Sequence, residues 1–275
     1  MPIITFSSDI GNQDFMPGAV KGQLLTAMPD ANIIDISHLL SPFNYPQAAY
    51  VCRNAIRNFP KGSFHLIMVN LFDEKPDHLL LVEHNGQYIG CGDNGLITLI
   101  LEEVPQKVIA LATHATAQKN TLHCSQVFAE AFRDIAAGKK IEQLGNPDVS
   151  IKVKNPLRPM LSNDWIEGQI IFIDNFENVV VNIQREDFEE QRKGRSFSIV
   201  FKRDETIEKI SETYADVAEG EKLAHFNSSG YLEIAINKGN AAGLFGLQGF
   251  SETLQVSTQQ NKLFYQTVKI FFENT

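Results

Sequence analysis

The order of apolar and amphipathic segments in the first half of the chain constrains the fold more than any other feature. Short apolar runs that predict strands lie near 3–7, 32–36, 63–70, 79–83, 87–91 and 107–112. Stretches with helical periodicity lie near 16–28, 46–58, 94–102 and 124–137. Strands and helices that alternate over about 150 residues are typical of an α/β layer, so we expect a largely parallel sheet covered by helices.

The pattern changes after a polar, proline-rich stretch from 145 to 159. Beyond it apolar residues recur with period two, in runs near 168–174, 178–183, 196–201, 231–236 and 264–272. Long helical stretches are scarce there, so this half favours a small β-barrel or sandwich. We place the two domains at residues 1–155 and 163–275, with the linker in the proline-rich stretch.

Composition narrows the class of partner. The chain has a formal net charge of −9 and no dense run of Lys or Arg, which argues against nucleic acid as a partner. No run approaches the roughly 18 apolar residues of a membrane span, and the N-terminus lacks the features of a signal peptide. Three widely separated cysteines suit a reducing compartment and match no zinc spacing. We therefore expect a cytoplasmic protein with no metal, membrane or nucleic-acid partner.

The first strand leads directly into small polar residues. Gly11 follows the apolar run, and the carboxylates Asp9 and Asp14 stand five positions apart. A buried parallel strand that ends in this way is typical of a ligand crevice, where a carboxylate accepts from ribose hydroxyls or from a ligand ammonium. The alternative is a plain strand-to-helix turn in which an aspartate caps the helix.

Two more segments of the first half carry candidate groups. Asp93, in a glycine-flanked turn after a strand, could cap the next helix or lie against a ligand. His123, Cys124 and Ser125 stand at the start of an amphipathic stretch. There they could serve acid–base or oxyanion roles, with a lowered thiol pKa, or they could simply pack in the interior.

Two polar loops of the second half could also bind a ligand. Asp174, Phe176 and Asn178 offer a carboxylate, an aromatic face and a carboxamide on one loop, which suit an ammonium, a flat ring and a base edge. Ser228 and Ser229 precede a strand and suit a carboxylate. Both loops are equally consistent with plain turns.

Taken in order, these segments resemble the S-adenosylmethionine hydroxide adenosyltransferase family, whose relatives include the fluorinase and the chlorinase. The similar segments extend over almost the whole chain: 4–14, 21–22, 35–38, 93–96, 121–129, 174–178, 182–183, 228–235 and 239–242. The resemblance implies an α/β N-terminal domain with a largely parallel sheet and an all-β C-terminal barrel. It also implies a homotrimer that binds S-adenosylmethionine (SAM) between neighbouring subunits, with SAM as the substrate and no cofactor.

The resemblance implies roles for several residues of the first half. Asp9 would hold the ribose hydroxyls, Asp14 would face the methionine ammonium, and Phe43 would pack against the nucleoside. Asp93 and Asn94 belong to a matching segment and are further substrate-binding candidates.

Corresponding roles follow for the second half. Asp174 would face the methionine ammonium, Phe176 would pack against the nucleoside, and Asn178 would read the adenine edge. Ser228 and Ser229 would meet the methionine carboxylate, although the arginine of the fluorinase is absent at Ser229. Glu233, in the same segment, is the last substrate-binding candidate.

The chain departs from the family at the residues thought to handle water. Asn70 stands at the place of an aspartate, and the place of an arginine falls near Asp77 and His78. His123 is retained, and the residue after it is Cys124. The catalytic candidates are therefore His123, Asn70 and Cys124.

Three functions stay open. The chain could hydrolyse SAM to adenosine and methionine through attack of water or hydroxide on the ribose C5′, or bind SAM or adenosine without catalysis. It could also use another nucleophile in a pocket shaped by Cys124 and Ser125, whereas a halogenase is least favoured. Because loss of an acid–base group typically costs about 10²–10⁴-fold, we expect slow or absent hydrolysis with binding preserved.

Overall fold

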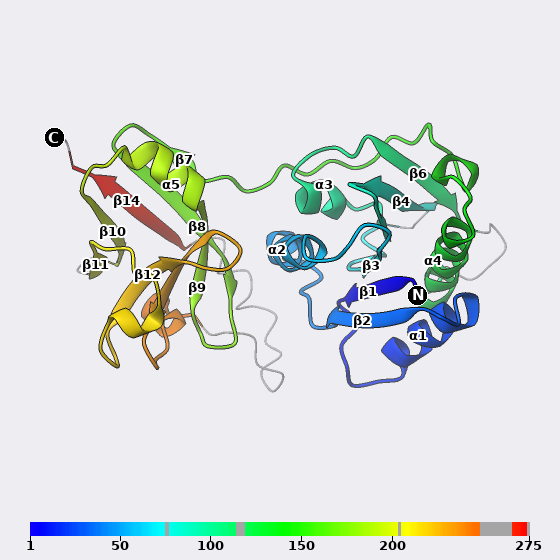
Figure 1. Cartoon of the computed structure of the whole chain (residues 1–275), viewed down its shortest axis with the longest axis horizontal. Coiled ribbons are helices and arrows are strands. Elements are labelled where there is room, and N and C mark those ends of the chain that lie inside the picture. Colours follow the sequence, from blue (N-terminus) through cyan, green and yellow to red (C-terminus); the bar gives the residue numbers. More distant parts are fainter. Residues whose placement is uncertain (75–76, 114–118, 203–204, 248–265, 274–275) are drawn as a thin grey trace. The chain divides into compact units, whose positions relative to one another are not determined.

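The computed structural model describes residues 1–74, 77–113, 119–202, 205–247 and 266–273 (Figure 1). By its internal contacts the chain divides into two compact units, Met1–Pro156 and Leu157–Thr275. Each unit has its own sheet and its own buried core, so each is described by itself.

The first unit is built on a six-stranded sheet with the order β2-β1-β3-β5-β4-β6. Its strands are β1 (Ile3–Ser8), β2 (Asn32–Ser37), β3 (Phe64–Met68), β4 (His78–His84), β5 (Gln87–Gly92) and β6 (Lys107–Ala112). The pairs β1–β2, β1–β3 and β3–β5 are parallel, whereas β4 runs antiparallel to both of its neighbours. The predicted largely parallel α/β sheet is confirmed, with β4 as the one reversed strand.

A tight hairpin explains why β4 is reversed. Asn85 and Gly86 connect β4 to β5, with φ angles of 52° and 77°. This left-handed pair is what a two-residue hairpin turn requires, and Asn-Gly adopts it at low cost. The hairpin brings the start of β4 to the same edge of the sheet as the carboxyl end of β5.

Helices cover both faces of this sheet (Figure 1). α1 (Met16–Ala27) packs against α4 (Thr121–Ala136) on one face, and α2 (Tyr45–Ile56) packs against α3 (Leu96–Leu101) on the other. Phe6 and Phe128 lie in the core of the α1–α4 face, whereas Ile67 and Ala48 lie in the core of the α2–α3 face. A short 3-10 helix, η1 (Ile141–Gln143), follows α4.

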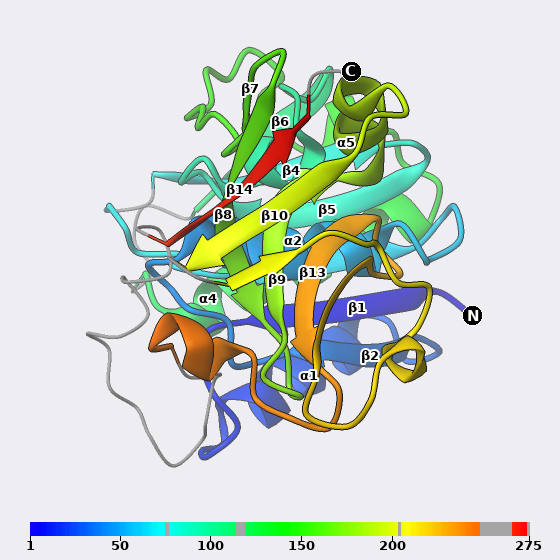
Figure 2. The same ribbon diagram turned by 90° about the vertical axis from the view of Figure 1, so that its left-hand side faces the viewer.

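The second unit is an antiparallel, nearly closed barrel (Figure 2). Its strands are β7 (Met160–Leu161), β8 (Trp165–Ile173), β9 (Val179–Gln184), β10 (Phe197–Lys202), β11 (Glu205–Ile207), β12 (Lys222–Phe226), β13 (Tyr231–Ile236) and β14 (Thr267–Phe272). The order is β11-β10-β14-β8-β9-β13-β12, with β7 on β8. A bridge between Ile210 and Ala224 joins the chain after β11 to β12. The predicted all-β barrel is confirmed; residues 264 and 265 of the expected last strand lie outside the described residues.

The second unit also contains a helix that the sequence pattern did not predict. α5 (Arg185–Arg192) carries one fully buried apolar side chain, Phe188, whose ring lies 5.1 Å from that of Phe197. Its other residues are polar, so no apolar stripe marks it in the sequence. Two 3-10 helices complete the unit, η2 (Tyr214–Asp216) and η3 (Ala242–Phe245).

Candidate active site

Candidate residues of the first unit gather at the carboxyl edge of its parallel strands. Asp9 follows β1, Asn70 lies just after β3, and Asp93 follows β5. The helix after β1 covers one face of the sheet, whereas the helix that leads into β3 covers the other. In open α/β sheets such a divergence of connections opens a crevice at the carboxyl ends of the two strands, where ligands bind.

Asp9 links β1 to β3 at this edge of the sheet. Its Oδ2 accepts a hydrogen bond of 2.7 Å from the backbone N–H of Asn70, and its own N–H donates to the carbonyl oxygen of Met68. Burial raises the pKa of Asp9 above its ordinary value, although backbone N–H groups of Asn70 and Asp9 act in the opposite direction. The loss of water around the carboxylate therefore outweighs the two backbone hydrogen bonds. Hydrogen bonds from ligand hydroxyls would stabilise its charged form.

Asn70 is held in one orientation. Its backbone is left-handed, with φ of 45°, a conformation that Asn tolerates better than most residues. Its Nδ2 donates to the hydroxyl of Tyr45 at 2.8 Å and to Oδ1 of Asp73 at 3.0 Å. Both amide protons are thereby used, which leaves Oδ1 as an acceptor.

Asn94 and Asp93 support this edge from β5. The buried Asn94 donates from Nδ2 to the carbonyl oxygens of Val69 and Asn70, at 2.9 and 3.1 Å. Oδ1 of Asp93 accepts from the backbone N–H of Lys152 at 2.8 Å. These polar atoms already have protein partners, which favours a positioning role over direct substrate contact.

His78, which the sequence analysis named near the place of the family's arginine, also lies at this edge. Its Nε2 lies 3.0 Å from Oδ2 of Asp93, and about a third of its side chain is exposed. The signal was in the hairpin: a two-residue Asn85-Gly86 turn pairs His84 with Gln87, and the same register carries back to His78 beside Asp93.

Two lysines of the predicted linker also lie at this edge. Nζ of Lys152 forms an ion pair of 2.6 Å with Glu74, and Nζ of Lys154 lies 4.8 Å from the ring centroid of Tyr45. Gly95 accommodates Lys154, because a Cβ there would approach the lysine Cγ to 2.6 Å. The segment is thus part of the first unit and places positive charge near Asn70.

Asp14 and Phe43 lie in loops of the first unit. Oδ1 of Asp14 accepts from the backbone N–H of Met16 at 2.8 Å, so this exposed carboxylate caps the start of α1. Phe43 precedes the N-cap of α2 and is 74% exposed. The ring is therefore accessible to a ligand, although a single exposed phenylalanine does not by itself indicate a binding site.

His123 and Cys124 occupy the first turn of α4. The backbone N–H of His123 donates to Oδ1 of Asn120, the N-cap of that helix. Cys124 is fully buried among apolar side chains, with Phe128 in the same cluster. Burial raises the thiol pKa, so the lowered pKa that the sequence analysis considered is wrong, and the thiolate is disfavoured.

A serine, a histidine and an aspartate also meet at the ends of β1 and β2. Oγ of Ser8 lies 2.8 Å from Nδ1 of His38, and Nε2 of His38 lies 3.1 Å from Oδ1 of Asp35. The residue types are those of a catalytic triad, but Ser8 is fully buried. The arrangement therefore supports the end of β1 next to Asp9 and exposes no nucleophile.

The loop between β8 and β9 is organised by Asp174. Its Oδ1 accepts from the backbone N–H groups of Phe176 and Asn178, and its Oδ2 accepts from Nδ2 of Asn178 at 3.0 Å. Asn178 is buried, whereas Phe176 is 74% exposed. The structure thus brings together the three residues predicted for this loop and presents the phenyl ring outward.

Glu233 lies at the centre of a polar network within the barrel. Its Oε1 accepts from the hydroxyl of Tyr214 at 2.6 Å and lies 3.1 Å from Nε2 of His225, and its Oε2 accepts from Asn227. Burial alone would raise the pKa of Glu233, but these hydrogen bonds lower it below its ordinary value. The same carboxylate and burial raise the pKa of Tyr214.

Ser228 and Ser229 lie in the turn between β12 and β13. Oδ1 of Asn227 accepts from the backbone N–H of Ser229 at 3.0 Å, and Gly230 closes the turn with φ of 81°. Ser228 is exposed and Ser229 is half-buried. The two hydroxyls therefore lie on an ordered turn, a few residues before Glu233 in the sequence.

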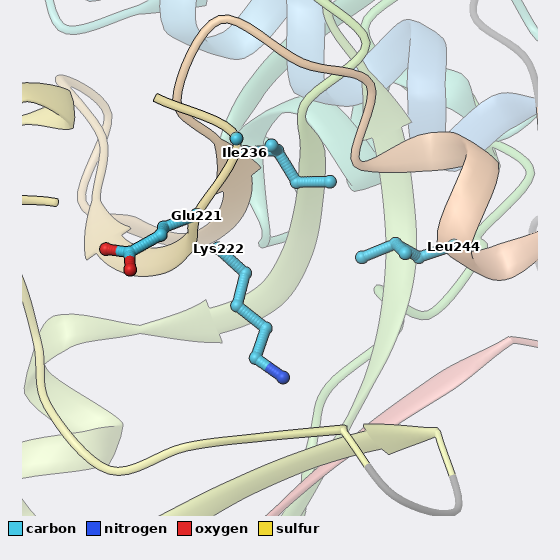
Figure 3. A pocket seen from close by; sticks show the side chains of 5 residues that line it. Glu221, Lys222, Ile236 and Leu244 are labelled. Atoms are coloured by element: carbon cyan, nitrogen blue, oxygen red, sulfur yellow. The ribbon is translucent and has the colours of Figure 1, made fainter. Parts of the chain in front are cut away.

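A cavity of about 430 Å³ in the second unit does not involve these residues. Gly220, Glu221, Lys222, Ile236 and Leu244 line it (Figure 3). None of them is a predicted site residue, and a single Lys–Glu pair among apolar groups specifies no ligand. Hydrogen bonding and burial locate the candidate site better than this cavity does.

Two further observations concern the described residues as a whole. No helix among them is long and apolar enough to cross a membrane. No group of three or more His, Cys, Asp or Glu side chains in the same ranges is arranged to hold a metal ion.

The sequence is similar to proteins of one family along most of its length. Residues 4–145 match the N-terminal domain and residues 168–253 the C-terminal domain of SAM hydroxide adenosyltransferases. A Thermus thermophilus protein named (R)-S-adenosyl-L-methionine hydrolase is 28% identical over 89% of this chain and 96% of its own. One of the same name from Methanocaldococcus jannaschii is 27% identical over 92% and 95%. A Nocardia brasiliensis fluorinase is 25% identical over 93% and 97%.

Solved structures share the fold. An uncharacterized conserved protein from Thermotoga maritima aligns with a TM-score of 0.80 over 98% of this chain and 99% of its own, at 24% identity. A conserved hypothetical protein from Thermus thermophilus aligns with a TM-score of 0.71 over 99% and 100%, also at 24% identity. Because both domains of the family match in order and extend over most of the sequence, the chain belongs to the SAM hydroxide adenosyltransferase family.

Proposed function

We propose that this protein hydrolyses S-adenosyl-L-methionine to adenosine and methionine, by attack of water or hydroxide on the ribose C5′. Family membership and two relatives named as SAM hydrolases support the reaction. The observation that carries the proposal is Asp9, a desolvated carboxylate at the carboxyl edge of β1 and β3. SAM is the substrate, and the reaction as written needs no cofactor.

The chemistry asks for positioning rather than for a strong nucleophile. The sulfonium of SAM is a good leaving group, so aiming a desolvated water at C5′ can supply much of the rate. In this proposal Asp9 accepts from the ribose hydroxyls, and Asp14 faces the methionine ammonium.

In the proposed trimer, residues of a neighbouring subunit's barrel complete the site. Phe176 stacks on the nucleoside, Asn178 reads the adenine edge, and Asp174 adds a second carboxylate for the ammonium. Ser228 and Ser229 meet the methionine carboxylate. Residues 1–155 then form the nucleoside-binding domain, and residues 163–275 form the barrel domain.

The proposed assembly is a cytoplasmic homotrimer with sites shared between subunits. Phe43 and Phe176, the two rings proposed to pack against the nucleoside, are each 74% exposed, so both are accessible to a ligand. Light scattering should give the mass of three chains at micromolar concentration. A stable monomer that still binds adenosine would contradict the shared site.

A second candidate function is nucleoside binding without catalysis. Asn70 favours it, because a carboxamide cannot deprotonate water and its Nδ2 is already committed to Tyr45 and Asp73. Binding through Asp9 would persist in either case.

One incubation separates the two functions. Purified protein is mixed with SAM, the nucleoside products are identified by mass, and adenosine affinity is measured by calorimetry. We expect adenosine and methionine in equal amounts. Adenosine binding without turnover would favour the second candidate, and a different 5′-substituted nucleoside would contradict both.

A further inference from the structure

We propose that His78, held by Asp93, is the general base that takes a proton from the attacking water. The inference rests on the proposed hydrolysis and names the group that performs its proton transfer. It gives the pair a specific role at the start of β4, near the place where the family has an arginine.

The first step concerns Asn70, which cannot be that base. Both amide protons are committed, to Tyr45 and to Asp73, at 2.8 and 3.0 Å. The remaining Oδ1 can accept a hydrogen bond from water and so orient it, but it cannot take the proton. A base for this water would therefore come from a residue other than Asn70.

The second step concerns the geometry of the His78–Asp93 pair. Oδ2 of Asp93 lies 3.0 Å from Nε2 of His78, so the proton of the neutral imidazole is assigned to Nε2 and Nδ1 is the free acceptor. Oδ1 of Asp93 is fixed by the backbone N–H of Lys152. A carboxylate that orients an imidazole and stabilises its cation is the arrangement that general bases use in hydrolases.

His78 lies at the edge of the sheet that carries the other candidate residues. Because β4 runs antiparallel to β5, its first residue lies at the carboxyl edge of the parallel strands, together with Asp93 and Asn70. Neighbouring strands lie about 4.8 Å apart, so β1, which leads to Asp9, and β4 are about 14 Å apart, with β3 and β5 between them. An imidazole, one water and part of a ribose held at Asp9 can share this distance.

His78 is accessible to a ligand, and Asp93 is nearly buried. The side chain of His78 is 31% exposed and that of Asp93 is 10% exposed, so the ring is reachable while its partner is shielded. Two ion pairs lie on neighbouring segments, Asp77 with Lys119 and Glu74 with Lys152, whereas Asp73 accepts from Asn70.

The proposed step balances as follows. The water oxygen forms a bond to C5′ while the C5′–S bond breaks, and its electron pair goes to sulfur, which gives neutral methionine sulfur. The water proton moves to Nδ1 of His78, and Asp93 stabilises the resulting imidazolium. Release of this proton to solvent restores the base.

The test compares two histidines on the same strand. His78→Ala removes the base, and Asp93→Asn keeps the ring but presents an amide N–H to Nε2, which favours the wrong tautomer. His84→Ala is the matched control, because His84 ends β4 at the opposite edge and also lies near a carboxylate, Glu103, at 3.5 Å. For each variant, SAM turnover is measured across pH, and adenosine affinity is measured by calorimetry.

We expect His78→Ala and Asp93→Asn to lower kcat by about 10²–10⁴-fold, with adenosine affinity unchanged and His84→Ala like the parent protein. The acid limb of the parent pH–rate profile should vanish in His78→Ala, which a merely structural role would not produce. Unchanged kcat in His78→Ala beside an active parent would overturn the inference and leave the proposed hydrolysis intact. A parent protein that makes no adenosine would overturn both.

Discussion

The half-buried carboxylate Asp9 in the first unit and the buried carboxylate Glu233 in the second have pKa values that are shifted in opposite directions. Burial dominates at Asp9, whose donors are backbone N–H groups, and its pKa is raised. Side-chain donors from His225, Tyr214 and Asn227 outweigh burial at Glu233, and its pKa is lowered. The charged form of Asp9 therefore lacks hydrogen-bond donors that a ligand can supply. The protein already supplies such donors to Glu233.

Two buried histidines repeat the contrast. In the first unit, Nδ1 of His65 lies 2.8 Å from the hydroxyl of Thr5, while its Nε2 has no hydrogen-bond partner among the described residues. Burial lowers the pKa of His65 to about 4. In the second unit, His225 is paired with Glu233 at 3.1 Å. In the first unit, Asp9 and His65 thus lack hydrogen-bond partners that would offset burial. In the second unit, Glu233 and His225 are partners of each other.

The largest expected effect is on binding at Asp9. In the proposed site Asp9 accepts two charge-assisted hydrogen bonds from the ribose, each contributing about 1.5–3 kcal/mol, so Asp9→Ala should lower adenosine affinity roughly a hundredfold or more. Calorimetry checks this, with Asp30→Ala as the control, an exposed aspartate in the turn before β2. Unchanged affinity in a folded Asp9→Ala protein would remove Asp9 from the site.

The next effect concerns the stability of the first unit in acid. The folded pKa of His65 lies below its ordinary value of 6.5, so its stabilising contribution is complete above pH 6.5 and is lost as pH falls toward about 4. The loss should be on the order of 3 kcal/mol for the parent protein and absent in His65→Gln. Denaturant titrations followed by circular dichroism at pH 7 and pH 4 give the free energy of unfolding of both proteins. An equal loss between the two pH values in the parent protein and in His65→Gln would refute the account of His65.

Glu233→Gln should destabilise the second unit by about 2 kcal/mol at pH 7, because charge-assisted hydrogen bonds contribute about that much. The folded pKa of Glu233 is lowered, so its contribution exists above pH 4.5 and disappears as pH falls through the folded value. Trp165, the only tryptophan of the chain, lies in β8, so its fluorescence follows the second unit alone. If His65→Gln also changed the unfolding transition seen by Trp165 fluorescence, the two units would not be independent and the comparison would fail.

The smallest effect is expected for Asn70→Asp. Asp tolerates the left-handed backbone at this position, but the new carboxylate would stand near Asp73 and lose the hydrogen bond donated to Tyr45. If His78 is the base, SAM turnover should change less than roughly tenfold. Steady-state SAM turnover of the parent protein and of Asn70→Asp, measured side by side, tests this. A much larger gain in turnover would indicate that a carboxylate at position 70, and not His78, accepts the proton.

The sequence predicted the architecture of both units, because the features that decide it are local. Alternating strand and helix patterns predicted the first unit, and period-two runs predicted the barrel. The reversed strand β4 was missed, although Asn85-Gly86 is a hairpin signal. α5 was missed because Phe188 is its only buried residue.

The candidate site was only partly predictable. Asp9, Asn70 and Asp93 follow strands whose carboxyl ends meet at one edge, so their proximity was foreseeable from a parallel sheet. The pairing of His78 with Asp93 depends on the register of an antiparallel pair, and that of Tyr214 with Glu233 on a 3-10 turn without a periodic signal. The roles of the predicted residues toward SAM stay predictions.

Hydrolysis in heavy-oxygen water tests the central claim most directly. The protein is incubated with SAM in labelled water, and the masses of adenosine and methionine are measured, with a sample without protein as the control. Attack of water on C5′ predicts one heavy oxygen atom in each adenosine molecule and none in methionine. Unlabelled adenosine, labelled methionine, or no adenosine above the control would contradict the proposed reaction.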